Sequence, residues 1–173
     1  ADSLMQYQRL SPQRSTLPEL IIQNHITGCT MIINEALRKI IRFPFPEAAI
    51  CHDWYLALLA SATGRVIFMN DCRIEYRKHN NNVFGPQQYS PGACLRMLKQ
   101  GRNKLKHRLR LTQQQAAAFL QQYGDLLSGS DIELLTAWGE IDRQSKSEKI
   151  ACCRKYHFRK NTWLRTLGMW WAL

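Results

Sequence analysis

The sequence predicts an α/β fold followed by an all-helical C-terminal region, and three observations lead to this prediction. Two apolar, β-branched runs, residues 26–33 (ITGCTMII) and 65–69 (RVIFM), have the composition of buried strands. Stretches with helical patterns lie between these runs. From Pro91 onward, apolar residues recur at helical spacing on a basic background. The chain therefore divides into residues 1–90, with strands and helices, and residues 91–173, with helices alone.

The first elements are a short helix, a strand and a second helix. Residues 17–23 are predicted to form the short helix, and residues 26–33, with a central glycine, form the first strand. Asn34 is expected to cap a helix over 35–41, because an asparagine side chain can accept a backbone N–H there. The FPFP segment at 43–46 must end that helix, since proline cannot continue it.

A longer helix and two further strands are expected next. The helix runs from His52 to about Thr63, and Gly64 is its C-terminal stop. The run at 65–69 is the following strand, and residues 73–77 (RIEYR) alternate between apolar and polar residues as another strand would.

Helices alone are predicted after residue 91. They cover residues 93–110, with leucines opposite a strongly basic face, then 112–123 and 130–142, the last two capped by Thr112 and by Ser130 or Asp131. The final stretch, 149–173, mixes cations with tryptophans and leucines.

The positive charge is concentrated in the second half. The 173 residues carry a formal net charge of +11. Residues 1–90 hold 9 Lys/Arg and 7 Asp/Glu, a net of +2, whereas residues 91–173 hold 15 and 6, a net of +9. Such an excess indicates a partner at the surface rather than the chemistry of a site. No run of 18 apolar residues and no signal-peptide pattern occurs, so a transmembrane helix and a secretory leader are not expected.

The six cysteines favour reduced thiols. Their spacing lacks both the density of a small secreted scaffold and the paired pattern of a zinc site.

The most informative local feature is His52-Asp53-Trp54 at the predicted start of a helix. A carboxylate there meets unsatisfied backbone N–H groups and the positive end of the helix dipole. A fixed, ionised aspartate can serve as general base toward a sugar hydroxyl. The simpler interpretation is that Asp53 caps the helix and Trp54 belongs to the core.

Two weaker features accompany it. Arg77 and His79 follow a predicted strand beside an asparagine-rich loop, where they could meet a diphosphate or a metal ion, or simply face solvent. Gly28, next to Cys29, allows the close approach of a ligand or of another strand.

In their order along residues 20–86, these motifs resemble the second half of bacterial family 2 glycosyltransferases. The quoted motifs are N-x-I-T-G-C-T-M-x-x-N, H-D-W-Y, G-R-V-I-F-M and Y-R-K-H-N-N-N-V, and the rhamnosyltransferase-type enzymes of surface polysaccharides are the nearest in pattern. The resemblance implies the acceptor-side half of a GT-A fold, a nucleotide-sugar donor, a saccharide or lipid-linked saccharide acceptor, and inversion at the anomeric carbon.

The resemblance also implies roles for individual residues. Asp53 takes the place of the catalytic base, while Gly28, Cys29, His52 and Trp54 fall on the acceptor side. Arg77 matches a diphosphate-binding position, and His79 matches a position that reaches the metal, Mg²⁺ or Mn²⁺. The nucleotide-binding half of the family and its D-x-D motif, which holds most of that metal, have no counterpart here, so we expect a fragment that is inactive alone.

The basic tail leaves two interpretations open. Trp163, Trp170 and Trp171 beside Arg159 and Arg165 suit the interface of an anionic membrane, at the cytoplasmic face where a peripheral enzyme would act. Alternatively, the tryptophans pack on the first half and the charges form a solvated face.

A different function class is a non-catalytic, basic interaction module that binds nucleic acid or an anionic membrane. Nucleic acid is the weaker of these partners, because no helix-turn-helix, zinc-finger or RRM signature occurs.

Overall fold

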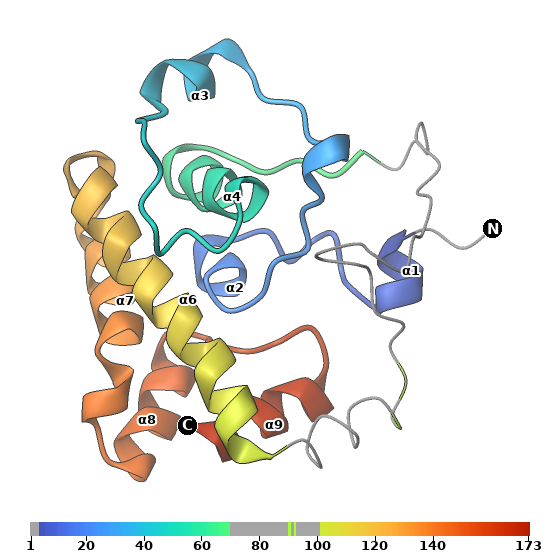
Figure 1. Cartoon of the computed structure of the whole chain (residues 1–173), viewed down its shortest axis with the longest axis vertical. Coiled ribbons are helices and arrows are strands. Elements are labelled where there is room, and N and C mark those ends of the chain that lie inside the picture. Colours follow the sequence, from blue (N-terminus) through green and yellow to red (C-terminus); the bar gives the residue numbers. More distant parts are fainter. Residues whose placement is uncertain (1–3, 70–89, 91, 93–100) are drawn as a thin grey trace.

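The computed structural model describes residues 4–69, 90, 92 and 101–173, and this part of the chain is built from helices (Figure 1). The helices are α1 (Leu4–Gln8), α2 (Leu17–Leu20), α3 (Glu35–Ile40), α4 (His52–Thr63), α6 (Arg102–Tyr123), α7 (Gly129–Gly139), α8 (Lys146–Lys155) and α9 (Trp163–Ala172). Three short 3-10 helices join them: η1 (Gly28–Thr30), η2 (Gly124–Leu126) and η3 (Ile141–Arg143).

The predicted α/β fold, and with it a partial GT-A sheet, is wrong for the described residues, because no strand or sheet occurs among them. The run at 26–33 contains η1 between irregular segments, and the run at 65–69 is irregular, with Ile67 74% exposed. A strand needs a neighbouring strand to take its backbone hydrogen bonds. In η1 the backbone hydrogen bonds form between residues close in the sequence, since the Thr30 N–H donates to the Thr27 carbonyl at 2.9 Å. The strand predicted at 73–77 lies outside the described residues.

The helices of the first half are confirmed close to their predicted bounds. The helix expected over 35–41 is α3, and the Asn34 side chain caps it by accepting the Leu37 N–H at 2.9 Å. The helix expected from His52 is α4, which ends at Thr63 before Gly64. The short helix expected over 17–23 is α2, which ends earlier, at Leu20.

Two predicted caps of the second half are wrong. Thr112 lies inside α6, which begins ten residues earlier at Arg102, and its hydroxyl donates back to the Leu109 carbonyl at 2.7 Å instead of capping a helix start. The same hydroxyl oxygen accepts the indole N–H of Trp138 at 3.2 Å, so Thr112 links α6 and α7 through a buried polar contact. The cap of α7 is Ser128, whose hydroxyl accepts the Asp131 N–H at 3.2 Å.

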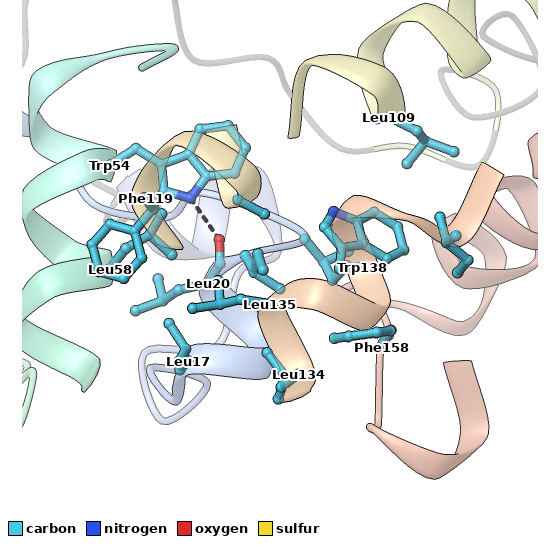
Figure 2. Packing of buried hydrophobic residues seen from close by; sticks show 14 of the residues in the cluster. Leu17, Leu20, Trp54, Leu58, Leu109, Phe119, Leu134, Leu135, Trp138 and Phe158 are labelled. Carbon is cyan, nitrogen blue, oxygen red and sulfur yellow. Dashed lines mark hydrogen bonds between the residues drawn. The ribbon is translucent and has the colours of Figure 1, made fainter. Parts of the chain in front are cut away.

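One hydrophobic core joins helices from both sides of residue 90. Trp54 of α4, Phe119 of α6, Trp138 of α7 and Phe158, which follows α8, all contribute to it (Figure 2). The indole of Trp54 donates to the carbonyl of Leu20, the last residue of α2, at 2.5 Å. The long helix α6 packs against both α7 and α9. The tail therefore packs on the first half of the chain through a shared apolar interior.

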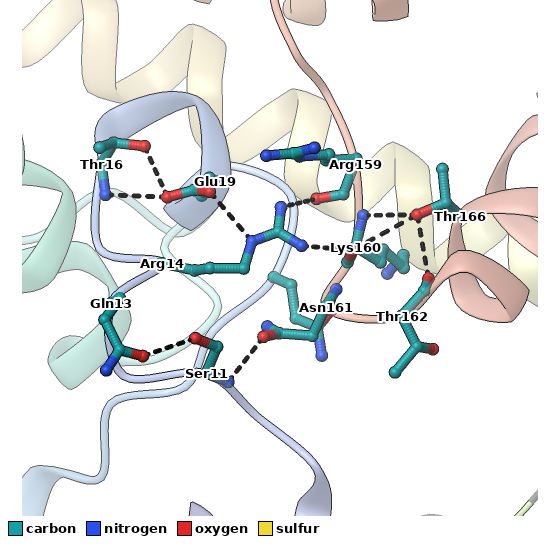
Figure 3. Close-up of polar contacts among 11 residues, drawn as sticks. Ser11, Gln13, Arg14, Thr16, Glu19, Arg159, Lys160, Asn161, Thr162 and Thr166 are labelled. Atoms are coloured by element: carbon teal, nitrogen blue, oxygen red, sulfur yellow. Dashed lines mark hydrogen bonds and ion pairs between the residues drawn. The ribbon is translucent and has the colours of Figure 1, made fainter.

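A polar network ties the N-terminal segment to the segment before α9 (Figure 3). The Arg14 guanidinium pairs with Glu19 at 3.0 Å and donates to two backbone carbonyls, those of Arg159 at 2.9 Å and Lys160 at 2.5 Å. Both side chains of the Arg14–Glu19 pair are largely shielded from solvent. This network fixes the position at which α9 begins.

Candidate functional site

The candidate site lies where η1 meets the first turn of α4. Asp53 is the second residue of α4, and its two carboxylate oxygens accept from different backbone groups. Oδ2 accepts the Gly28 N–H at 2.9 Å, and Oδ1 accepts the Trp54 N–H at 2.6 Å. The first backbone N–H groups of a helix lack partners within the helix, so a carboxylate is favourable at this place. The Asp53 carboxylate is thereby fixed between two segments of the chain.

Gly28 is required here because α4 comes so close to it. A Cβ at this position would lie 2.8 Å from His52 Nε2, 3.3 Å from Asp53 Cβ and 3.5 Å from Asp53 Oδ2. The His52 ring is exposed and could turn away, but the contact with the base of the Asp53 side chain leaves less room. Gly28, His52 and Asp53, which the sequence analysis assigned to one site, are therefore brought together.

Cys51 lies beside Asp53, and Asn24 lies beside Cys51; neither residue was in the sequence prediction. The Asn24 side chain accepts the Ile26 N–H at 2.8 Å and its amide nitrogen lies 3.8 Å from Cys51 Sγ. Burial and the neighbouring Asp53 carboxyl raise the pKa of the Cys51 thiol to about 12. The thiol is therefore neutral near pH 7 and unsuited to be a nucleophile. The sequence feature that could have identified Cys51 is its position directly before His-Asp-Trp, which is the N-cap position of α4.

Of the remaining predicted site residues, two are described and two lie outside the described residues. Cys29 is an exposed free thiol of η1, next to Gly28. Trp54 is buried in the core, with its indole turned toward α2 (Figure 2). Arg77 and His79 lie outside the described residues.

The described residues do not assemble a donor set for the predicted Mg²⁺ or Mn²⁺. Within this part of the chain, no group of three or more His, Cys, Asp or Glu side chains is placed to hold a metal ion. We therefore derive no step of a reaction through a metal at this site.

In comparisons with protein-family models, curated proteins and solved structures, nothing matches this chain. The resemblance to family 2 glycosyltransferases thus depends on the motif residues quoted above. In a search of the described helices for a membrane span, none combines the necessary length with the necessary apolar character.

The geometry of Asp53 suits proton acceptance. Each carboxylate oxygen has two lone pairs and uses one of them for a backbone N–H, which leaves capacity for a hydroxyl donor. The side chain is partly exposed, and the His52 ring beside it is exposed as well. A sugar hydroxyl could therefore reach the carboxylate from solvent without breaking either backbone contact.

Proposed function

We propose that this chain carries the base-bearing part of an inverting, rhamnosyltransferase-like glycosyltransferase similar to those of family 2, with helices in its described residues in place of the predicted sheet. Its substrates would be a nucleotide-sugar and a hydroxyl of a surface-polysaccharide or lipid-linked saccharide. The observation that supports the proposal is the joining of Gly28, His52 and Asp53 around one partly exposed carboxylate. Gly28 lies 25 residues before Asp53 and belongs to a different motif of the resemblance from His52-Asp53.

In the proposed reaction Asp53 takes the proton of the acceptor hydroxyl. The hydroxyl oxygen then forms a bond to C1 of the donor sugar, on the face opposite the leaving group, and the bond from C1 to the diphosphate breaks. The bonding pair leaves with the nucleoside diphosphate, and the proton remains on Asp53 until solvent removes it. The backbone contacts of Asp53 would hold the carboxylate in line with the attacking oxygen.

The donor side of the reaction is assigned to a separate nucleotide-binding part. The divalent cation, together with the D-x-D motif absent from this sequence, belongs to that part in our proposal, with Arg77 and His79 as contributions of this chain. Nucleotide-sugars and lipid-linked acceptors meet at the cytoplasmic face of a membrane, and we place the protein there as a peripheral component.

The test measures sugar transfer by the full chain combined, in trans or by fusion, with the nucleotide-binding half of a family 2 transferase. Asp53→Asn preserves the shape of the side chain and removes its basicity. We expect kcat to fall by roughly 10²–10⁴, the usual contribution of a general base, with the KM for the donor nearly unchanged.

Asp131→Asn is the matched control, because Asp131 also lies in the first turn of a helix, α7, and bonds to its cap. We expect transfer by this variant to stay within about twofold of the wild type. Transfer by Asp53→Asn within a factor of three of the wild type would contradict the assignment of the base.

A further inference from the structure

Helix α9 presents an apolar stripe to solvent. Trp163 is 71% exposed, Leu167 is 48% exposed and Trp171 is 43% exposed. Residues four apart lie above one another on a helix, so these three side chains share one face, about 12 Å long. On the other side of α9, Met169 and Ala172 are buried in the core. We call the three exposed side chains the α9 face.

Cations are frequent in the sequence that contains the α9 face, and acids are absent from it. Residues 149–173 contain six Lys/Arg and no Asp/Glu. Arg154 and Arg159 are exposed, and the Arg154 guanidinium lies 5.9 Å from the centre of the Trp170 ring. This end of the molecule therefore combines exposed indoles with positive charge.

The positive charges near the start of α9 come from several elements of the fold. Burial and the nearby charges of Arg165 and Arg108 lower the pKa of Lys160 to about 8. These cations come from the segment before α9, from α9 itself and from α6. Lys160 and Arg165 are turned toward the interior, since burial acts on Lys160 and the Arg165 guanidinium donates to the Gln8 carbonyl at 3.1 Å; they add to the positive potential of this end without contacting a phosphate themselves.

Contacts within the chain itself hold helix α9 in place. The Thr162 side chain caps it by accepting the Arg165 N–H at 3.4 Å. The preceding segment is fixed by Arg14 and by Asn161, which accepts the Ser11 N–H at 2.8 Å (Figure 3). A partner would therefore meet a formed helix and would not bear the entropy of ordering it.

We propose that the α9 face binds the surface of an anionic lipid bilayer, with its indoles at headgroup depth and the exposed cations Arg154 and Arg159 on lipid phosphates. A second copy of the chain is a poor occupant, because it would bring two like-charged surfaces together. Nucleic acid fits less well, because Leu167 occupies the centre of the face between the two indoles and offers no stacking surface. The inference is independent of catalysis by Asp53.

The experiment is co-sedimentation of the full chain with vesicles of phosphatidylcholine alone or with phosphatidylglycerol added. We expect binding that requires the anionic lipid, together with a blue shift of tryptophan emission. The variant W163A/L167A/W171A should lower the partition coefficient on the order of 10- to 100-fold, because it removes the apolar surface that enters the interface.

Matched variants separate this face from general surface effects. I32A/I67A/M69A removes strongly exposed apolar side chains elsewhere and should leave vesicle binding unchanged. Arg159→Gln should weaken binding severalfold more than Lys39→Gln, which removes the same charge on α3, at the opposite end of the molecule in Figure 1. Far-UV circular dichroism verifies that every variant retains its helices.

Several results would overturn the proposal. Equal binding to both kinds of vesicle would exclude the role of the charges, and unchanged binding by W163A/L167A/W171A would exclude the face. Absence of vesicle binding combined with binding to duplex or single-stranded DNA would favour a nucleic acid instead. Asp53→Asn should bind vesicles like the wild type, so a failure of the catalytic proposal leaves this measurement intact.

Discussion

Replacing Trp54 by phenylalanine is expected to destabilise the folded chain by about 2–4 kcal/mol. Trp54 is only 9% exposed and lies in the core between α4 and α2 (Figure 2). Its indole N–H donates to the Leu20 carbonyl at 2.5 Å. Carbonyls in the last turn of a helix have no partner within the helix, so this one depends on a group from outside α2.

The magnitude has two parts. Phenylalanine cannot donate the hydrogen bond, and a buried carbonyl left without a partner costs about 1–3 kcal/mol. The smaller ring also leaves a cavity and buries less apolar surface, which adds about 1 kcal/mol. Because the helices on both sides of residue 90 share this core, the loss should affect the stability of the described fold as a whole.

The assay is urea unfolding followed by far-UV circular dichroism, since tryptophan fluorescence is itself changed by the substitution. Trp163→Phe is the control, because Trp163 is exposed, and it should cost less than about 0.5 kcal/mol. If Trp54→Phe cost no more than this control, Trp54 would not be the core residue that we describe.

Two further predictions concern a buried histidine and the exposure of the cysteines. The pKa of His25 is lowered by burial, so the unfolded chain binds more protons below about pH 6.5 and stability should fall as the pH drops from 7.5 to 5.5. Urea unfolding of His25→Gln should show a smaller loss over that range, and an equal loss would contradict the prediction. With Cys72 and Cys94 replaced by serine, Cys29 should react rapidly with a thiol reagent at pH 8 in the folded chain. We expect the other described cysteines to react only after unfolding, because they are partly or fully buried and have raised pKa values: Cys51, Cys152 and Cys153. A second thiol that reacts as fast as Cys29 in the folded chain would contradict this prediction.

The sequence predicted the elements that depend on local contacts. Asn34 caps α3 through its own side chain, and α4 ends where Gly64 follows it. These signals act within a few residues, so a pattern in the sequence is sufficient to find them. Ser128 shows the limit of such reasoning, because several polar residues compete for the start of α7 and only the backbone geometry selects among them.

The strands could not be predicted in the same way. The run at 26–33 has strand composition, but a strand exists only when another segment accepts its hydrogen bonds. Gly28 shows the alternative, since its N–H donates to the Asp53 side chain instead of to a neighbouring strand. The composition of this run was correctly recognised, but the partners of its backbone groups depend on contacts that are distant in the sequence.

The candidate site was predictable in part. The resemblance assigned Gly28, His52 and Asp53 to one site, and the structure has them close together. Asn24 and Cys51 were missed because their link runs between side chains of two segments, which no pattern along the chain encodes.

The tail tryptophans differ in exposure although they lie on one helix. Adjacent residues on a helix point about 100° apart, so Trp171 can face solvent while Trp170, which stacks with Arg154, lies half-buried. The same helix therefore packs into the core and presents an apolar face. Because α9 and α4 share that core, a bilayer bound to the α9 face would orient the whole folded part. The Asp53 carboxylate would then be held in one position relative to the lipid surface, because α4 moves with that core.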